Sequence, residues 1–206
     1  MLMADQVAPI IKRLQALSGP IHLVGHSHGA SLAALTAVEL EDRVASLSLY
    51  EPNSFGALID DGLEASHQEI ISRFGDIETR MDTPETRRRF AEDLMNFWLG
   101  QGAWDQLKGE MRDQLVGVME PTAREVYAAL YSPFSLAALT PLQARTLLMF
   151  DPHTPPAARL VSDRFQARMP ACHVAHFPRR GHLAPIIHAA EVNRVIIAHI
   201  RAHMQA

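Results

Sequence analysis

Residues 21–30 read IHLVGHSHGA, and this stretch decides the fold class. A short apolar run ends at Val24, and Gly25, Ser27 and Gly29 follow in the spacing Gly-X-Ser-X-Gly. A run of this length that ends in a glycine turn predicts a strand buried on both faces, and the small residues after the turn predict a helix close to a sheet. The stretch therefore predicts a sharp strand-to-helix turn with Ser27 at its tip.

The same turn predicts that Ser27 is a nucleophile. In such a turn the two glycines let the helix approach the strand, and the serine is held in a strained conformation with its hydroxyl exposed at the top of the sheet. The N–H of the next residue, His28, stands at the helix N-terminus and is able to stabilise an oxyanion. A chance match in a glycine-containing turn is the alternative, but the strand–turn–helix context favours Ser27 as a nucleophile.

The rest of the chain alternates between strand and helix patterns. Apolar residues at helical spacing predict an amphipathic helix over the first twenty residues. Further strands are expected at 44–50, 146–150 and 172–177, and further helices at 157–167 and 192–200. Strands that alternate with helices imply parallel pairing, so the fold class is α/β with a mostly parallel sheet flanked by helices.

Residues 53–140 carry no convincing strand pattern. Thr83 and Pro84 are typical of a helix start and Gly100 of a helix end, while Thr122 to Glu125 form a capping-box pattern that predicts the start of another helix. The predicted organisation is therefore a first part of the α/β core at 1–52, a helical insertion at 53–140, and a second part of the core at 141–206.

A serine nucleophile needs a base, and the chain order serine, acid, histidine places that base after the last strand. The loop after the fourth predicted strand reads RRGHLAP at 179–185. Gly181 would let this loop turn His182 over the sheet edge toward Ser27. An exposed loop histidine is the alternative, and the position and chain order favour His182 as the base.

Four stretches carry a resemblance to a known superfamily: LVGHSHGASLA at 23–33, SLSLYEP at 46–52, TLLMFDPHTPP at 146–156, and RRGHLAPIIHAAEVNRVI at 179–196. With them the chain resembles the α/β-hydrolase superfamily, as a serine hydrolase with a helical lid. The resemblance implies a partial α/β-hydrolase fold with the lid at 53–140. It also implies hydrolysis of a small carboxylic ester or related acyl compound through an acyl-enzyme, with no metal or organic cofactor.

The acid of the catalytic triad has two candidates. Relatives usually carry it after the strand that corresponds to 146–150, which makes Asp151 the first candidate. A gapless comparison, however, puts Asp151 where a glycine belongs and Thr154 in the place of the acid. Some members carry the acid after the preceding strand, where this chain has Glu51. Asp151 is preferred, with Glu51 as the alternative.

Other residues near the motif permit further hypotheses. His26, His28 and His182 suggest a metal site, but no acidic or cysteine partner is near in sequence, so no metal is expected. His28 is expected to give its backbone N–H and to line the pocket with its side chain. Four aromatic residues of the insertion are candidates for an acyl pocket, with lid core as the alternative: Phe97, Trp98, Trp104 and Phe134.

Composition excludes several function classes. The net charge is -4 with a pI near 6.2, and Lys and Arg are scattered, which argues against nucleic acid or an anionic membrane as partner. Cys172 is the single cysteine, so no internal disulfide forms and a reducing compartment is expected. No secretion signal is recognisable, and a cytoplasmic protein acting on a small acyl substrate is predicted.

The chain differs from the α/β hydrolases that it resembles in the segment before Ser27. They carry about four strands before the first predicted helix, and a loop there supplies a second oxyanion donor. Only 26 residues precede Ser27 here, without a His-Gly-Gly loop, so the chain looks N-terminally truncated and the strand at 21–24 is expected at an open sheet edge. The alternative function is a catalytically impaired hydrolase fragment that serves as an interaction module or a homo-oligomer paired through this edge.

Overall fold

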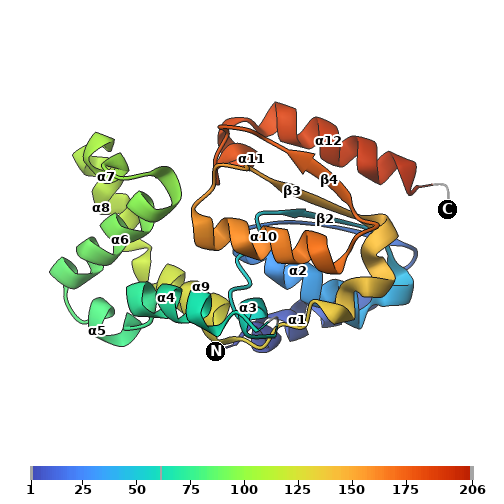
Figure 1. Ribbon diagram of the computed structural model, residues 1–206, viewed down its shortest axis with the longest axis horizontal. Coiled ribbons are helices and arrows are strands. Elements are labelled where there is room, and N and C mark those ends of the chain that lie inside the picture. The colour runs from blue at the N-terminus through green and yellow to red at the C-terminus, as the bar shows by residue number, and fades with distance from the viewer. Residues whose placement is uncertain (1, 61, 205–206) are drawn as a thin grey trace.

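The computed structural model describes residues 2–60 and 62–204, and it has the predicted α/β architecture (Figure 1). A four-stranded sheet has the order β1-β2-β3-β4, with every neighbouring pair parallel. The strands are β1 (Ile21–His26), β2 (Val44–Tyr50), β3 (Thr146–Phe150) and β4 (His173–His176). The predicted parallel sheet is confirmed, and the second and third strands have their predicted bounds.

The strand register brings the four carboxyl ends to one edge of the sheet. His26 pairs with Tyr50, Tyr50 with Met149, and Phe150 with His176. The segments that follow β1, β2, β3 and β4 therefore begin beside one another. This is the edge at which open α/β sheets place their ligands.

Helices cover both faces of the sheet. They are α1 (Met3–Gln15), α2 (His28–Glu39), α10 (Pro156–Arg168), α11 (Ala184–Ile187) and α12 (Ala189–Ala202). On one face α12 packs on Tyr50 and Met149 through Val192 and Ile196. On the other face lie α2 and α10, and α1 packs against α2 (Figure 1). Because α2 presents fully buried alanines, its axis lies close to the strands, as its small residues predict.

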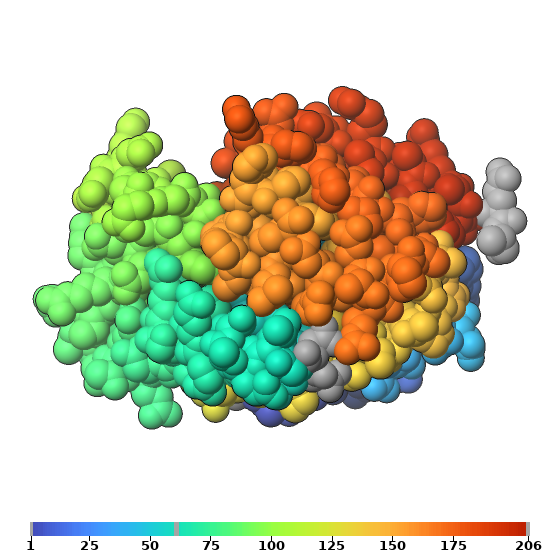
Figure 2. Space-filling view, in the orientation of Figure 1, coloured from blue at the N-terminus to red at the C-terminus, as the bar shows by residue number. Residues whose placement is uncertain are grey.

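Between β2 and β3 the described residues form helices, here called the inserted helices. They are α3 (Ala57–Asp60), α4 (Glu64–Phe74), α5 (Ile77–Met81), α6 (Pro84–Leu99), α7 (Ala103–Gln106), α8 (Gly109–Gly117) and α9 (Met119–Tyr131). Two 3₁₀ helices at Glu41–Arg43 and Ala137–Arg145 lead into β2 and β3. The helices α4 to α8 stand beyond one end of the sheet (Figure 1), and Figure 2 shows a notch between this green lobe and the orange segments.

The helix signals of the insertion are partly confirmed. Thr83 caps α6 by accepting a hydrogen bond from the Thr86 N–H, and Gly100 ends that helix with φ 98°. Thr122 does not open a helix, because α9 has already begun at Met119 and the Thr122 hydroxyl donates to the Val118 carbonyl. Pro121 explains the earlier start, since a proline needs no N–H partner in the first turn.

The first strand also differs from its prediction. Val24 in β1 is 51% exposed, so β1 is not buried on both faces. In the described part of the chain, β2 alone pairs with β1, which stands at the edge of the sheet. No helix among the described residues is long and apolar enough to cross a membrane.

Candidate active site

Ser27 occupies a strained turn between β1 and α2. Its backbone has φ 55° and ψ -122°, a conformation that non-glycine residues rarely adopt, and it is the N-cap of α2. A Cβ on Gly25 would lie 2.3 Å from the Gly29 carbonyl oxygen and 2.5 Å from the Ala30 Cα. Only a glycine at position 25 therefore allows this contact between strand and helix.

Gly29 has a different environment. A Cβ added there would meet no heavy atom within 4 Å. The sequence pattern predicted that both glycines of the motif serve the close approach, and the structure assigns that role to Gly25 alone. The close contact is between the Cα side of Gly25 and the backbone carbonyl of Gly29, so a side chain at position 25 would block it and a side chain at position 29 would not.

A chain of short hydrogen bonds joins Ser27, His182 and Glu51. His182 Nε2 lies 2.9 Å from Ser27 Oγ, and His182 Nδ1 lies 2.7 Å from Glu51 Oε2. Since a carboxylate only accepts hydrogen bonds, the proton of the neutral imidazole is on Nδ1, and Nε2 is left to accept from the Ser27 hydroxyl. His182 and Glu51 are buried, whereas Ser27 is half-buried.

The loop after β4 brings His182 to this position. Gly181 has φ 68°, which suits a glycine, and its carbonyl accepts a hydrogen bond from the Tyr50 hydroxyl at 2.9 Å. The sequence predicted that Gly181 turns the loop toward Ser27, and the structure places His182 beside Ser27 in this way.

Glu51 is held by two further hydrogen bonds. It is 1% exposed and has φ 42° at the end of β2. The Asp151 N–H donates to Glu51 Oε1 at 2.9 Å, and the Thr154 hydroxyl donates to Glu51 Oε2 at 3.1 Å. Both oxygens of the buried Glu51 side chain therefore have hydrogen-bond partners, as buried polar atoms require.

Asp151, the preferred acid from sequence, does not contact the His182 ring. Its Oδ1 accepts from the N–H and ring of His153, and its Oδ2 accepts from the Gly181 N–H at 2.7 Å. Burial alone would raise the pKa of Asp151, but the backbone N–H groups of His153 and Gly181 bring it below its usual value. The structure thus places Glu51, and not the preferred Asp151, against the His182 ring, because the Asp151 carboxylate is turned into its own loop.

The structure also shows roles that sequence reasoning missed. The gapless comparison with relatives placed Thr154 at the position of the acid. This placement was the one sequence signal that Thr154 lies near His182, where its hydroxyl contacts Glu51. The contact of His26 with His182 had no such signal. His26 Nε2 donates to the His182 carbonyl at 2.8 Å, and burial followed by the nearby His182 lowers the pKa of His26 to about 4.

His26 and His28 do not point to a common ligand. The His28 ring, 8% exposed, donates from Nε2 to Gln6 Oε1 at 2.8 Å, and burial lowers its pKa. His28 is also the first residue of α2, so its backbone N–H has no acceptor within the helix. Among residues 2–60 and 62–204, no group of three histidine, cysteine, aspartate or glutamate side chains is arranged to hold a metal ion.

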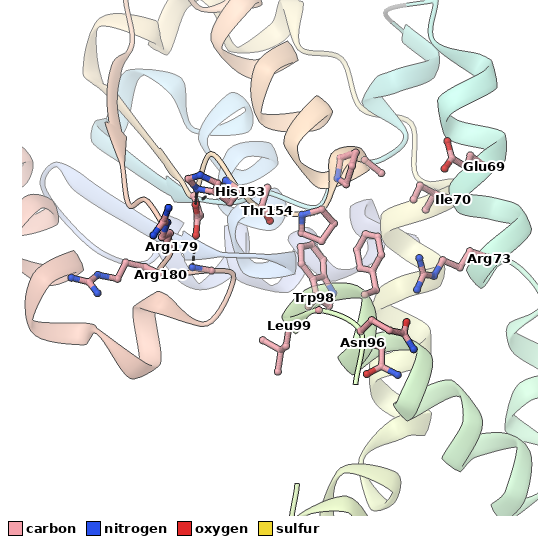
Figure 3. Close-up of a pocket in the computed structure, with 18 residues that line it drawn as sticks. Glu69, Ile70, Arg73, Asn96, Trp98, Leu99, His153, Thr154, Arg179 and Arg180 are labelled. Carbon is pink, nitrogen blue, oxygen red and sulfur yellow. Dashed lines mark hydrogen bonds and ion pairs between the residues drawn. The ribbon is translucent and has the colours of Figure 1, made fainter. Parts of the chain in front are cut away.

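Trp98, at the end of α6, stacks on the imidazole of His182. The ring centroids are 3.5 Å apart with an interplanar angle of 16°. Trp98 also lines a cavity of about 650 Å³ that opens between the inserted helices and the loops after β3 and β4 (Figure 3). Asp151, Thr154 and Gly181 line the same cavity, so it adjoins His182 and Glu51.

The other aromatic candidates have different surroundings. Phe97 lines the cavity beside Trp98. Trp104 is buried among the inserted helices with the guanidinium groups of Arg88 and Arg112 over its ring, and Phe134 packs on Phe165. Neither Trp104 nor Phe134 lines this cavity, so both are core residues.

Solved structures of hydrolases resemble this fold. A carboxylesterase of the ammonia-oxidizing thaumarchaeon Nitrososphaera gargenis matches with TM-score 0.70 and 15% identity, over 100% of this chain and 74% of that one. An esterase from Thermogutta terrifontis matches with TM-score 0.62 and 20% identity, over 99% of this chain and 74% of that one. The meta-cleavage product hydrolase of Pseudomonas fluorescens IP01 matches with TM-score 0.57 and 19% identity, over 98% of this chain and 72% of that one.

At these identities the likeness establishes the fold. No curated protein sequence matches the chain. The model of one family, described as the alpha/beta hydrolase family, matches residues 3–195. Since this match spans nearly the whole chain and the parallel sheet, strained serine turn and helical insertion agree with it, the protein belongs to the alpha/beta hydrolase family.

Proposed function

We propose that the protein is a serine hydrolase that cleaves a small carboxylic ester or related acyl compound through an acyl-enzyme. The observation that carries the proposal is the chain from Ser27 Oγ to His182 Nε2 and from His182 Nδ1 to Glu51 Oε2, at 2.9 and 2.7 Å. A serine, a histidine and a carboxylate in this order are the parts that nucleophilic acyl transfer needs.

Each residue has a defined role in the proposed reaction. The Ser27 hydroxyl attacks the carbonyl carbon of the substrate while His182 Nε2 accepts its proton. The imidazolium that forms is stabilised by the Glu51 carboxylate, which also fixes the tautomer of the ring. The His28 N–H, at the positive end of α2, donates to the oxyanion of the tetrahedral intermediate.

The reaction is then completed in two steps. His182 returns its proton to the leaving oxygen, the bond between carbonyl carbon and leaving group breaks, and Ser27 holds the acyl group. A water molecule gives a proton to His182 and attacks the carbonyl carbon, the bond to Ser27 Oγ breaks, and His182 returns the proton to Oγ as the carboxylic acid leaves. The inserted helices act as a lid, since Trp98 covers one face of the His182 ring. Exclusion of bulk water on that side strengthens the interaction between imidazolium and carboxylate.

Covalent labelling tests this function. A fluorophosphonate probe is expected to modify the wild-type chain at Ser27 within minutes, and the chain is expected to hydrolyse p-nitrophenyl acetate. Ser27→Ala and His182→Ala should abolish both reactions. Ser72→Ala serves as a matched control, because Ser72 is exposed on α4 and its hydroxyl donates only to the Glu69 carbonyl. A folded wild-type chain that is neither labelled nor hydrolytic would contradict the proposal.

A further inference from the structure

Two cavities of very different size share one wall. The large cavity has about 650 Å³, and a second one of about 30 Å³ lies among the inserted helices. Ile70, Phe97 and Trp98 line both of them. Trp98 is the member of this wall that also stacks on His182, so the partition between the cavities ends at the reacting imidazole.

The large cavity lies on the side of the histidine and the acid. Gly181, directly before His182, lines it, and so do Asp151 and Thr154, which both donate hydrogen bonds to Glu51. The remainder of its wall is mixed. Arg73 and Asn96 lie on the side of the inserted helices (Figure 3), and apolar residues such as Leu99 and Pro155 lie among the polar ones. It therefore offers space and hydrogen-bonding groups to a polar moiety.

The small cavity is linked through Asn53 to α2, the helix that begins with the expected oxyanion donor. Asn53 lines it, and the Asn53 side chain accepts a hydrogen bond from Ser31 at 3.1 Å in α2, the helix that begins at Ser27 and His28. Apart from Asn53, its lining side chains are apolar or aromatic. A volume of 30 Å³ holds about two water-sized groups, so it accommodates a methyl or ethyl group but no longer chain.

The chemistry of acyl transfer orients a substrate between these cavities. His182 must donate a proton to the leaving oxygen, so the leaving group lies on the histidine side, while the acyl group lies on the other side of the carbonyl. We propose that Trp98 separates an acyl pocket from a leaving-group pocket. The enzyme is then specific for short acyl groups of about two to three carbons on a larger, polar leaving group, a size set by the 30 Å³ cavity. This specificity rests on the function proposed above.

A series of esters that differ only in the acyl chain tests this partition. For p-nitrophenyl acetate, butyrate, hexanoate and octanoate, wild-type kcat/KM is expected to fall about tenfold or more between acetate and hexanoate. Trp98→Ala joins the two cavities and should raise the ratio of kcat/KM for hexanoate to that for acetate about tenfold or more. Trp98→Leu should shift the ratio in the same direction by less, and it replaces Trp98→Ala if that variant does not fold.

Two controls make the outcome specific. Trp104→Phe changes the other tryptophan of the chain, which lines neither cavity, and should leave the chain-length ratio unchanged. Ala129→Val narrows the small cavity that Ala129 lines, and should lower kcat/KM for butyrate more than for acetate. Melting temperatures establish that each variant is folded.

The outcomes distinguish this inference from the proposed function. A wild-type chain that is labelled at Ser27 but prefers octanoate, or a folded Trp98→Ala variant with an unchanged ratio, would overturn the partition alone. A folded chain without labelling or hydrolysis would overturn the serine hydrolase function and this specificity together. Loss of chain-length discrimination in Trp98→Ala, with Trp104→Phe like wild type, is the result expected.

Discussion

The carboxylate of Glu51 lies 2.7 Å from the imidazole of His182, although the two residues are 131 positions apart in the sequence. They meet because β2 ends at Tyr50 and the loop after β4 crosses the same edge of the sheet. Asp151 stands at the end of the intervening strand β3, yet its hydrogen bonds hold the loop rather than the ring. The carboxylates of Glu51 and Asp151 thus lie in one site, but the first contacts the His182 ring and the second contacts loop backbone.

Glu51→Gln is expected to lower kcat/KM for p-nitrophenyl acetate by about 10³ to 10⁴, because an amide no longer stabilises the imidazolium and admits the wrong tautomer. The matched change Asp151→Asn retains an acceptor for the Gly181 N–H and should cost about tenfold or less. Initial rates at pH 7.5 measure both effects. The reverse order of the two losses would assign the acid to Asp151 instead.

Thr154→Val is expected to lower kcat about tenfold with little change in KM, because the substitution keeps the shape of the side chain and removes one hydrogen bond to the Glu51 carboxylate. Thr154→Ser keeps the hydroxyl and should recover most of the loss. Steady-state kinetics with p-nitrophenyl acetate separate kcat from KM. An increase in KM alone, or a serine variant as slow as the valine variant, would show that the hydroxyl does not position Glu51.

The strand-to-helix turn was predictable from sequence because it is local. The apolar run before Gly25 and the small residues after Gly29 determine a strand and a helix within a few residues of Ser27. The loop that carries His182 was predictable for the same reason, since Gly181 marks its turn and the preceding strand pattern gives its place in the sheet.

Which carboxylate contacts His182 was not predictable in the same way. The parallel strands β2 and β3 are each followed directly by a carboxylate at the same sheet edge, and sequence does not tell which side chain turns toward the ring. Glu51 reaches His182 because its backbone adopts φ 42° and its side chain has one more carbon than that of Asp151. The stack of Trp98 on His182 is tertiary as well, since it depends on how α6 packs over the core.

His26 is expected to make stability depend on pH. Burial, and then the nearby His182, lower its pKa from 6.5 to about 4, so between these values the unfolded chain binds more protons than the folded one. Stability therefore rises with pH across this window and is lost as pH falls from about 6.5 toward 4. His26→Gln keeps an N–H able to donate to the His182 carbonyl and does not titrate.

Melting temperatures of wild type and His26→Gln, measured between pH 7 and 4.5, isolate this contribution from that of other histidines. The wild-type value should fall further than that of the variant, by a difference on the order of 5 °C. Parallel curves for the two chains would show that the pKa of His26 is the same in the folded and the unfolded state.

Gly25→Ala tests the contact that shapes the turn at Ser27. An alanine Cβ would lie 2.3 Å from the Gly29 carbonyl oxygen and 2.5 Å from the Ala30 Cα, and these backbone atoms cannot rotate away. The start of α2 must shift, and with it Ser27 and the His28 N–H. We expect a loss of about 3 kcal/mol in the free energy of unfolding and of nearly all fluorophosphonate labelling.

Gly29→Ala is the matched control on the other glycine of the motif. Its Cβ would meet no atom within 4 Å, and alanine favours a helix more than glycine does, so stability should be unchanged or rise by up to about 1 kcal/mol with Ser27 still reactive. Denaturant unfolding and the rate of labelling compare the two variants. Equal losses in both would show that the turn needs two glycines, whereas a loss confined to Gly25→Ala attributes the strained serine to one contact between β1 and α2.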